Sequence, residues 1–163
     1  MGIMSKLLLI DTREKQKAIT DILATFDDAG VKHVSTKLLF GDYMDYNRPN
    51  LVIDRKQTIA ELAKNVTRER KRFVAELERA KMAGAHLVIL VAQDKFKDRD
   101  KWVSVRDVSD LLTWSSQYTE IRGEKVFRVL SELIYKYDIS VQFCHGSTTG
   151  KKILEILYNG ERA

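Results

Sequence analysis

The sequence predicts an α/β domain in which helices flank a mixed central β-sheet. Short apolar runs, such as residues 6–10 (KLLLI) and 85–92 (AHLVILVA), have the length and composition of buried strands. Between them lie segments whose apolar residues recur every three or four positions, as in helices that cover a sheet. The length of 163 residues suits one domain, which we expect to span 1–163.

The first part of this domain, residues 1–93, contains most of the expected strands. A helix over residues 14–30 is indicated by Ile19, Ile22, Leu23 and Phe26, and Gly30 is a natural C-terminal stop. Strands at 31–40, 41–46 and 50–54 follow, the last two joined by the turn residues Asn47-Arg48-Pro49. A long amphipathic pattern predicts a helix over 58–83, closed by Gly84, before the strand at 85–92.

The second part, residues 94–163, reads as helical with a C-terminal β-α unit. The charged segment 94–101 is expected to be a surface loop. Helices are predicted at 103–118 and 124–137, a strand at 139–144 and a last helix at 148–158. Because strands and helices alternate in this way, the predicted sheet is sandwiched between helices.

Composition narrows the class of partner. The formal net charge of +5 favours a polyanion, and the basic residues concentrate at Arg68, Arg70, Lys71 and Arg72. No apolar run approaches the roughly 18–20 residues of a membrane helix. The single Cys144 cannot form an internal disulfide, which favours a reducing compartment.

A pair of aspartates is the first chemical signal. If the loop is residues 47–49, Asp42 lies directly opposite Asp54, and strand alternation puts Lys56 on the same face. Two adjacent carboxylates repel one another, and a divalent cation such as Mg²⁺ would resolve the conflict. The alternative interpretation is a solvated strand end that leads into a helix.

Asp11 and Glu14 are the second signal, because Asp11 also ends an apolar strand. If that strand neighbours the hairpin, both carboxylates reach the same edge of the sheet. Alternatively, Asp11 or Thr12 caps the following helix and Glu14 lies favourably in its first turn.

Three segments in this order resemble the XPF/Hef-type (ERCC4-domain) nuclease family of the PD-(D/E)xK superfamily. LLLIDTREK resembles its D-x-R-E opening, FGDYMDY its G-D-Y/F segment, and LVIDRKQTIAEL its V-E-R-K motif. The resemblance implies a restriction-endonuclease-like fold and a DNA endonuclease that depends on Mg²⁺ or Mn²⁺. It makes Asp11, Asp42 and Asp54 the metal ligands and Lys56 the catalytic lysine, with Glu14 and Arg55 in supporting catalytic positions.

The resemblance is imperfect after the lysine. In the family three residues separate the lysine from the next acid, whereas four residues (57–60) separate Lys56 from Glu61 here, and Asp54 stands where the family has Glu. Residues 94–163 contain neither helicase motifs nor a helix-hairpin-helix pair, so the chain resembles the compact stand-alone modules of bacteria and phages. We therefore expect a cytoplasmic protein of a bacterial or phage-infected cell, or a nuclear one in a eukaryote. The resemblance also implies that the domain can form a homodimer.

The expected substrate is branched, flap or fork DNA in repair, recombination or phage DNA processing. Two alternatives are a PD-(D/E)xK nuclease without branch specificity and an inactive DNA-binding partner subunit. Candidate phosphate contacts are the basic residues near the motifs and Lys151, which lies in a glycine-flanked segment whose spacing does not fit a P-loop. They are Arg13, Arg68, Arg70, Lys71, Arg72 and Lys151.

Overall fold

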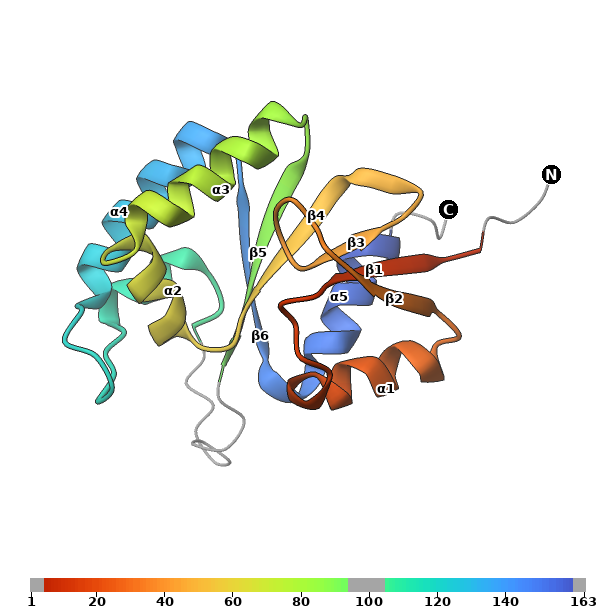
Figure 1. Ribbon diagram of the computed structural model, residues 1–163. Coiled ribbons are helices and arrows are strands. Elements are labelled where there is room, and N and C mark those ends of the chain that lie inside the picture. Colours follow the sequence, from red (N-terminus) through yellow and green to blue (C-terminus); the bar gives the residue numbers. More distant parts are fainter. Residues whose placement is uncertain (1–4, 94–104, 160–163) are drawn as a thin grey trace.

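A six-stranded mixed sheet organises the protein, and helices cover both of its faces (Figure 1). The computed structural model describes residues 5–93 and 105–159. The strand order is β2-β1-β3-β4-β5-β6, in which β3 is antiparallel to both of its neighbours and the other pairs are parallel. The predicted fold class, α/β with a mixed sheet flanked by helices, is confirmed.

The N-terminal unit is β1 (Leu7–Asp11), a 3₁₀ turn η1 (Gln16–Ala18), α1 (Thr20–Asp28) and β2 (Lys32–Thr36). Gly30 ends the helix with a positive φ of 71°, a conformation that glycine adopts without strain. The strand predicted at 31–40 ends early, at Thr36. The backbone then turns toward the hairpin, where the Leu38 amide donates to the Asp11 carboxylate at 2.8 Å.

The hairpin of β3 (Tyr43–Asp45) and β4 (Arg48–Lys56) sets the positions of the motif residues. Tyr43 pairs with Ile53 and Met44 with Val52, which is the predicted register. The predicted turn is wrong, because a bulge shifts the pairing so that Asp45 opposes Arg48 and the turn falls at Tyr46 and Asn47. The bulge lies beyond Met44, so it leaves the register at the other end of the hairpin unchanged.

Two helices, α2 (Ile59–Val66) and α3 (Arg70–Met82), replace the single helix predicted at 58–83. The break is stabilised locally, since the Thr67 hydroxyl donates to the Ala63 carbonyl at 2.7 Å and the Glu69 amide to the Lys64 carbonyl. Apolar periodicity did not reveal it, because Val66 and Phe73 are seven residues apart and stay on one face across the break.

The remaining elements are β5 (His86–Gln93), a 3₁₀ helix η2 (Val108–Thr113), α4 (Gly123–Tyr137), β6 (Ser140–His145), η3 (Gly146–Thr148) and α5 (Thr149–Tyr158). The helix predicted at 103–118 is wrong within the described residues, where only η2 forms. Asp107 begins η2 with a capping box, and the Ser116 hydroxyl then accepts the Tyr118 amide, a local bond that competes with helix. The surface loop predicted at 94–101 lies outside the described residues.

The sheet separates two apolar layers. Helices α2, α3 and α4 cover one face, over Val52, Ile89 and Val91, and α1 and α5 cover the other, over Ile53 and Leu90 (Figure 1). Alternation along β4 therefore sends Asp54 and Lys56 toward α2 and α3, and Arg55 toward the opposite layer. In the described part of the chain, no helix has the length and apolar character needed to cross a membrane.

Candidate active site

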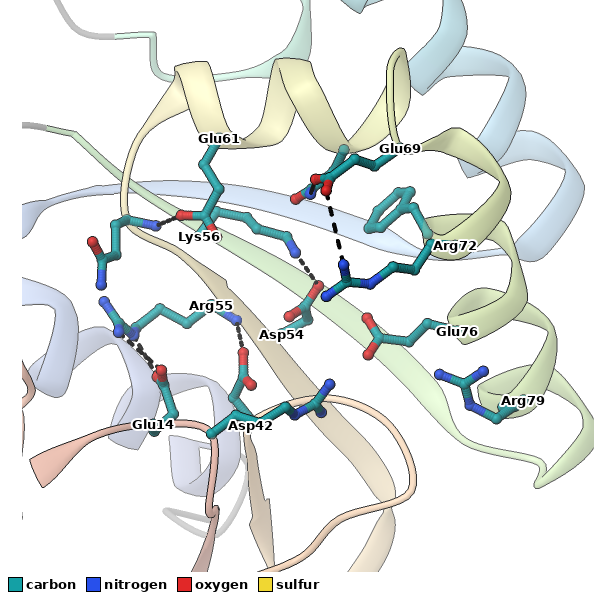
Figure 2. A pocket seen from close by; sticks show the side chains of 14 residues that line it. Glu14, Asp42, Asp54, Arg55, Lys56, Glu61, Glu69, Arg72, Glu76 and Arg79 are labelled. Carbon is teal, nitrogen blue, oxygen red and sulfur yellow. Dashed lines mark hydrogen bonds and ion pairs between the residues drawn. The ribbon is translucent and has the colours of Figure 1, made fainter.

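A polar pocket of about 320 Å³ lies where β4 ends, against α2 and α3 (Figure 2). The side chains that line it come from the three motif segments, from these two helices and from Glu69, the N-cap residue of α3. The lining residues are Arg13, Glu14, Asp42, Asp54, Arg55, Lys56, Gln57, Glu61, Asn65, Glu69, Arg72, Phe73, Glu76 and Arg79.

Asp54 and Lys56 form a buried ion pair on the floor of this pocket. Lys56 Nζ lies 3.0 Å from Asp54 Oδ2 and 5.3 Å from the centre of the Phe73 ring. Burial disfavours the ammonium, but the Asp54 carboxylate outweighs it and raises the pKa of Lys56 above its usual value. Lys56 is therefore a protonated group at neutral pH.

Asp42 joins this pair from the residue before β3. Its carboxylate accepts the Arg55 amide at 2.8 Å, and the Asp42 amide donates to the Ile53 carbonyl at 2.7 Å. Burial, followed by the charge of Asp54, raises the pKa of Asp42 well above its usual value. The two carboxylates thus share one face of the hairpin, as the predicted register requires.

Gly41 fixes the approach of the chain to Asp42. Its φ is 71°, and a Cβ at this position would lie 2.3 Å from Val52 Cγ1. The glycine in the segment FGDY is therefore needed for both conformation and space.

Arg55 and Glu14 form a second buried ion pair, on the face of the sheet that α1 and α5 cover. Arg55 Nη2 donates to Glu14 Oε2 at 3.0 Å, and the Tyr43 hydroxyl donates to Glu14 Oε1 at 2.8 Å. Burial opposes the charge on Arg55, but Glu14 raises the pKa of the guanidinium. This pairing holds the Arg55 backbone where its amide meets Asp42.

Asp11 is not brought into the pocket with the other two aspartates. Its carboxylate is buried, Oδ1 accepts the Leu38 amide at 2.8 Å, and Oδ2 accepts the Arg13 amide at 3.0 Å as well as Arg13 Nε. Arg13 in turn lines the pocket and donates Nη2 to the Gly41 carbonyl at 3.2 Å. The structure thus connects Asp11 to the site through Arg13.

Most of the other predicted residues lie outside the pocket. Glu61 lines it, but its carboxylate accepts the Gln57 amide at 2.8 Å and completes the N-terminal cap of α2. Of the four clustered basic residues, only Arg72 lines the pocket, whereas Arg70 lies 3.8 Å from Glu132 of α4. Lys151 is on α5, which covers the opposite face of the sheet.

Sequence reasoning missed one wall of the pocket. Glu69, Arg72, Glu76 and Arg79 point into it from the start and one face of α3. Their spacing of three, four and three residues is the helical period, so this alternating acidic and basic stripe was visible in the sequence. What the sequence did not show is that the stripe faces the end of β4.

The charge balance of the pocket is close to neutral. The lining residues include six carboxylates and five cationic groups. Much of the positive charge is already paired, as Arg55 is with Glu14 and Lys56 with Asp54. A phosphate that enters this pocket therefore lacks a compensating charge from the protein alone.

The fold and site together match one class of protein. A mixed sheet with Asp-x-Lys at a strand end and a second acid beside it is consistent with the PD-(D/E)xK class. The chain belongs to the ERCC4 domain family, whose model matches residues 10–156.

Solved structures agree with this assignment at the level of the fold. "XPF from Aeropyrum pernix" superposes with a TM-score of 0.68 at 16% identity, over 96% of this chain and 65% of that one. "XPF from Aeropyrum pernix, complex with DNA" superposes with a TM-score of 0.67 at 16% identity, over 96% and 66%. This chain thus spans about two thirds of each of those chains. A comparison with curated proteins gives no match.

Proposed function

We propose that the protein is a divalent-metal-dependent DNA endonuclease that hydrolyses phosphodiester bonds. The observation that carries the proposal is the convergence of Asp42, Asp54 and Lys56 in one pocket. The family assignment supports it.

The donor set fits Mg²⁺ or Mn²⁺. Burying Asp42 beside Asp54 is costly, and a cation between them would remove the repulsion. Asp54 Oδ2 is buried without a hydrogen bond of regular geometry in the described part of the chain, although Lys56 lies near it. Within that part, no three Asp, Glu, His or Cys side chains lie close enough together to bind one metal ion by themselves. Mg²⁺ needs only one or two carboxylates, because water and substrate phosphate fill its other positions.

Asp42 and Asp54 would hold the ion, and we propose that Asp11 contributes by orienting Arg13 rather than as a third ligand. The bound ion would lower the pKa of a water molecule and offset charge on the phosphate. The Lys56 ammonium would stabilise negative charge that develops on the phosphate oxygens. Arg13 and Arg72 have side chains that are 58% and 85% exposed, and both can bind phosphates that flank the reacting one.

DNA is the proposed substrate. The similar XPF fold has been solved as a complex with DNA, and this chain carries a net charge of +5. Branched, flap or fork DNA, processed in repair, recombination or phage replication, is the finer part of the proposal and derives from the family resemblance.

Cleavage of end-labelled fork, flap, junction and plain duplex DNA, in Mn²⁺ or Mg²⁺ and in a chelator, tests the proposal. We expect metal-dependent cutting that falls on the order of 100-fold or more in Asp54→Asn, which loses a proposed ligand of the ion, and in Lys56→Ala, which loses the ammonium that would stabilise charge on the phosphate. Glu78→Gln is the matched control, since Glu78 is on α3 outside the pocket. Absence of cutting with every substrate would refute the enzyme and leave a DNA-binding partner, whereas equal cutting of duplex and fork would refute branch specificity alone.

A further inference from the structure

Glu76 is an acid of the pocket to which the proposed mechanism gives no role. It lies in the middle of α3, and Figure 2 shows its carboxylate directed toward Asp54. Asp54 and Lys56 both act electrostatically on its charge. Within residues 5–93 and 105–159, its side chain accepts one hydrogen bond, a long one from the Gly41 amide at 3.4 Å.

A carboxylate in this place works against the binding of DNA unless a cation is present. Every phosphate that enters the pocket is negative, and Glu76 would repel it at short range. The helix itself does not need this charge, because the apolar positions Phe73, Leu77 and Ala80 supply its packing. A role toward the cation explains why an acid occupies the wall opposite Asp54.

Glu61, the first acid after Lys56 in the sequence, has a structural role instead. Its carboxylate caps α2 through the Gln57 amide at 2.8 Å. Glu76 has no comparable strong bond among the described contacts, so it is free to face the site.

We propose that Glu76 is a positioning residue of the metal site, accepting hydrogen bonds from water molecules of the ion held by Asp42 and Asp54. An indirect role is favoured because no three ligand side chains of the described chain are close enough to form a cage. Mg²⁺ retains several water molecules when proteins bind it, and groups that orient such outer contacts strongly affect affinity. This inference rests on the proposed function.

Calorimetric titration of the DNA-free protein with Mn²⁺ tests the role without any cleavage. We expect Glu76→Ala to bind Mn²⁺ about 10–100-fold more weakly than the unmodified protein. Glu76→Gln keeps an oxygen acceptor but loses the charge, so its affinity should lie between the two. Glu78→Gln, on the same helix, should bind as the unmodified protein does.

Glu76 also touches the segment that carries Gly41, so a second variant separates the metal role from a structural one. Arg79 anchors the same segment, with Nε donating to the Leu39 carbonyl at 3.2 Å. Arg79→Ala loosens this segment and removes a positive charge, so its Mn²⁺ affinity should not fall. Equal weakening in Arg79→Ala and Glu76→Ala would overturn the proposal, as would unchanged affinity in Glu76→Ala. If the unmodified protein bound no Mn²⁺ and cut no DNA, the proposed function would fail first, and that result is distinct from either outcome.

Discussion

Asp42 and Asp11 are neighbours, joined by a hydrogen bond from the Asp11 amide to the Asp42 carbonyl at 2.8 Å. Their carboxylates nevertheless lie in opposite electrostatic environments. Asp42 is buried beside Asp54, which raises its pKa, whereas the pKa of Asp11 is lowered because hydrogen bonds from Arg13 and Leu38 outweigh its burial. The two residues should therefore respond to the same substitution with opposite changes in stability.

Asp42→Asn should stabilise the metal-free protein at pH 8. A carboxyl whose pKa is raised by folding stabilises the fold at low pH, and this contribution is lost as pH rises through the folded-state pKa. The ionised carboxylate then destabilises the fold, whereas the amide of Asn carries no charge and still accepts the Arg55 amide. In thermal unfolding with a chelator present, the Tm of Asp42→Asn should exceed that of the unmodified protein at pH 8. Near pH 4 the two Tm values should differ little. A lower Tm at pH 8 would contradict the assigned repulsion.

Asp11→Asn should destabilise the protein at neutral pH, by about 2 kcal/mol, since it removes charge-assisted hydrogen bonds from Arg13. A lowered pKa contributes stability above the unfolded-state value, and this contribution is lost as pH falls through the folded-state pKa. The difference in Tm from the unmodified protein should therefore be largest near pH 7 and shrink under acid conditions. An unchanged Tm at pH 7 would show that the contact between Asp11 and Arg13 does not stabilise the folded protein.

At the scale of elements, α3 presents two basic faces that the sequence does not distinguish. Arg72 lines the pocket, and Arg70 lies beside Glu132 on α4. If DNA enters the pocket as proposed, we expect the face of α3 that carries Arg72, and not the face that carries Arg70, to contact its phosphates.

Arg72→Ala should weaken DNA binding and reduce the slope of log K against log salt by about 0.9, the loss of one phosphate contact. Arg70→Ala, the same change two residues away, should leave the slope unchanged. Fluorescence anisotropy with Ca²⁺ in place of Mg²⁺, at several salt concentrations, measures both. Equal slopes for the two variants would place the DNA elsewhere on the surface.

The turn before β3 depends on Gly41 for both its conformation and its packing. Gly41→Ala should cost at least about 1–3 kcal/mol, since the added methyl group meets Val52 and the positive φ of 71° is strained for alanine. Gly30→Ala is the matched control, because Gly30 has the same φ but no atom within 4 Å of the added Cβ. Denaturant unfolding should show a larger loss at Gly41, and equal losses would remove the packing argument.

At the scale of the whole molecule, the metal should act as a ligand of the folded state only. Mn²⁺ at 100 times its Kd should add about 2.7 kcal/mol to the free energy of unfolding. We expect a clear rise of Tm with Mn²⁺ in the unmodified protein and little or none in Asp54→Asn. A similar rise in both would indicate that the ion binds elsewhere. The homodimer expected from the family resemblance stays a prediction, which sedimentation analysis can test.

Much of the fold followed from the sequence because its signals are local. Apolar runs gave β1 and β5 and helical periodicity gave α4 and α5, in each case to within one or two residues. The errors arose where short-range hydrogen bonds override periodicity, as at Thr67 between α2 and α3 and at Asp107 before η2. Such bonds depend on individual side-chain conformations, which apolar patterns do not report.

For the site, the sequence by itself determined that Asp54 and Lys56 share one face, because strand alternation is a property of a single short segment. It placed Asp42 opposite Asp54 only on the condition of a turn at 47–49, and the structure keeps that register although the turn lies at Tyr46 and Asn47. Only the tertiary structure decided that the Asp11 carboxylate is buried and accepts the Leu38 amide, outside the pocket, and that Glu76 enters the pocket from α3. The burial of Asp11 against the segment that carries Leu38, and the entry of Glu76 beside β4, depend on how segments far apart in the chain pack against each other. That packing is set by the apolar layers on either side of the sheet, and the residues of the motifs do not indicate it.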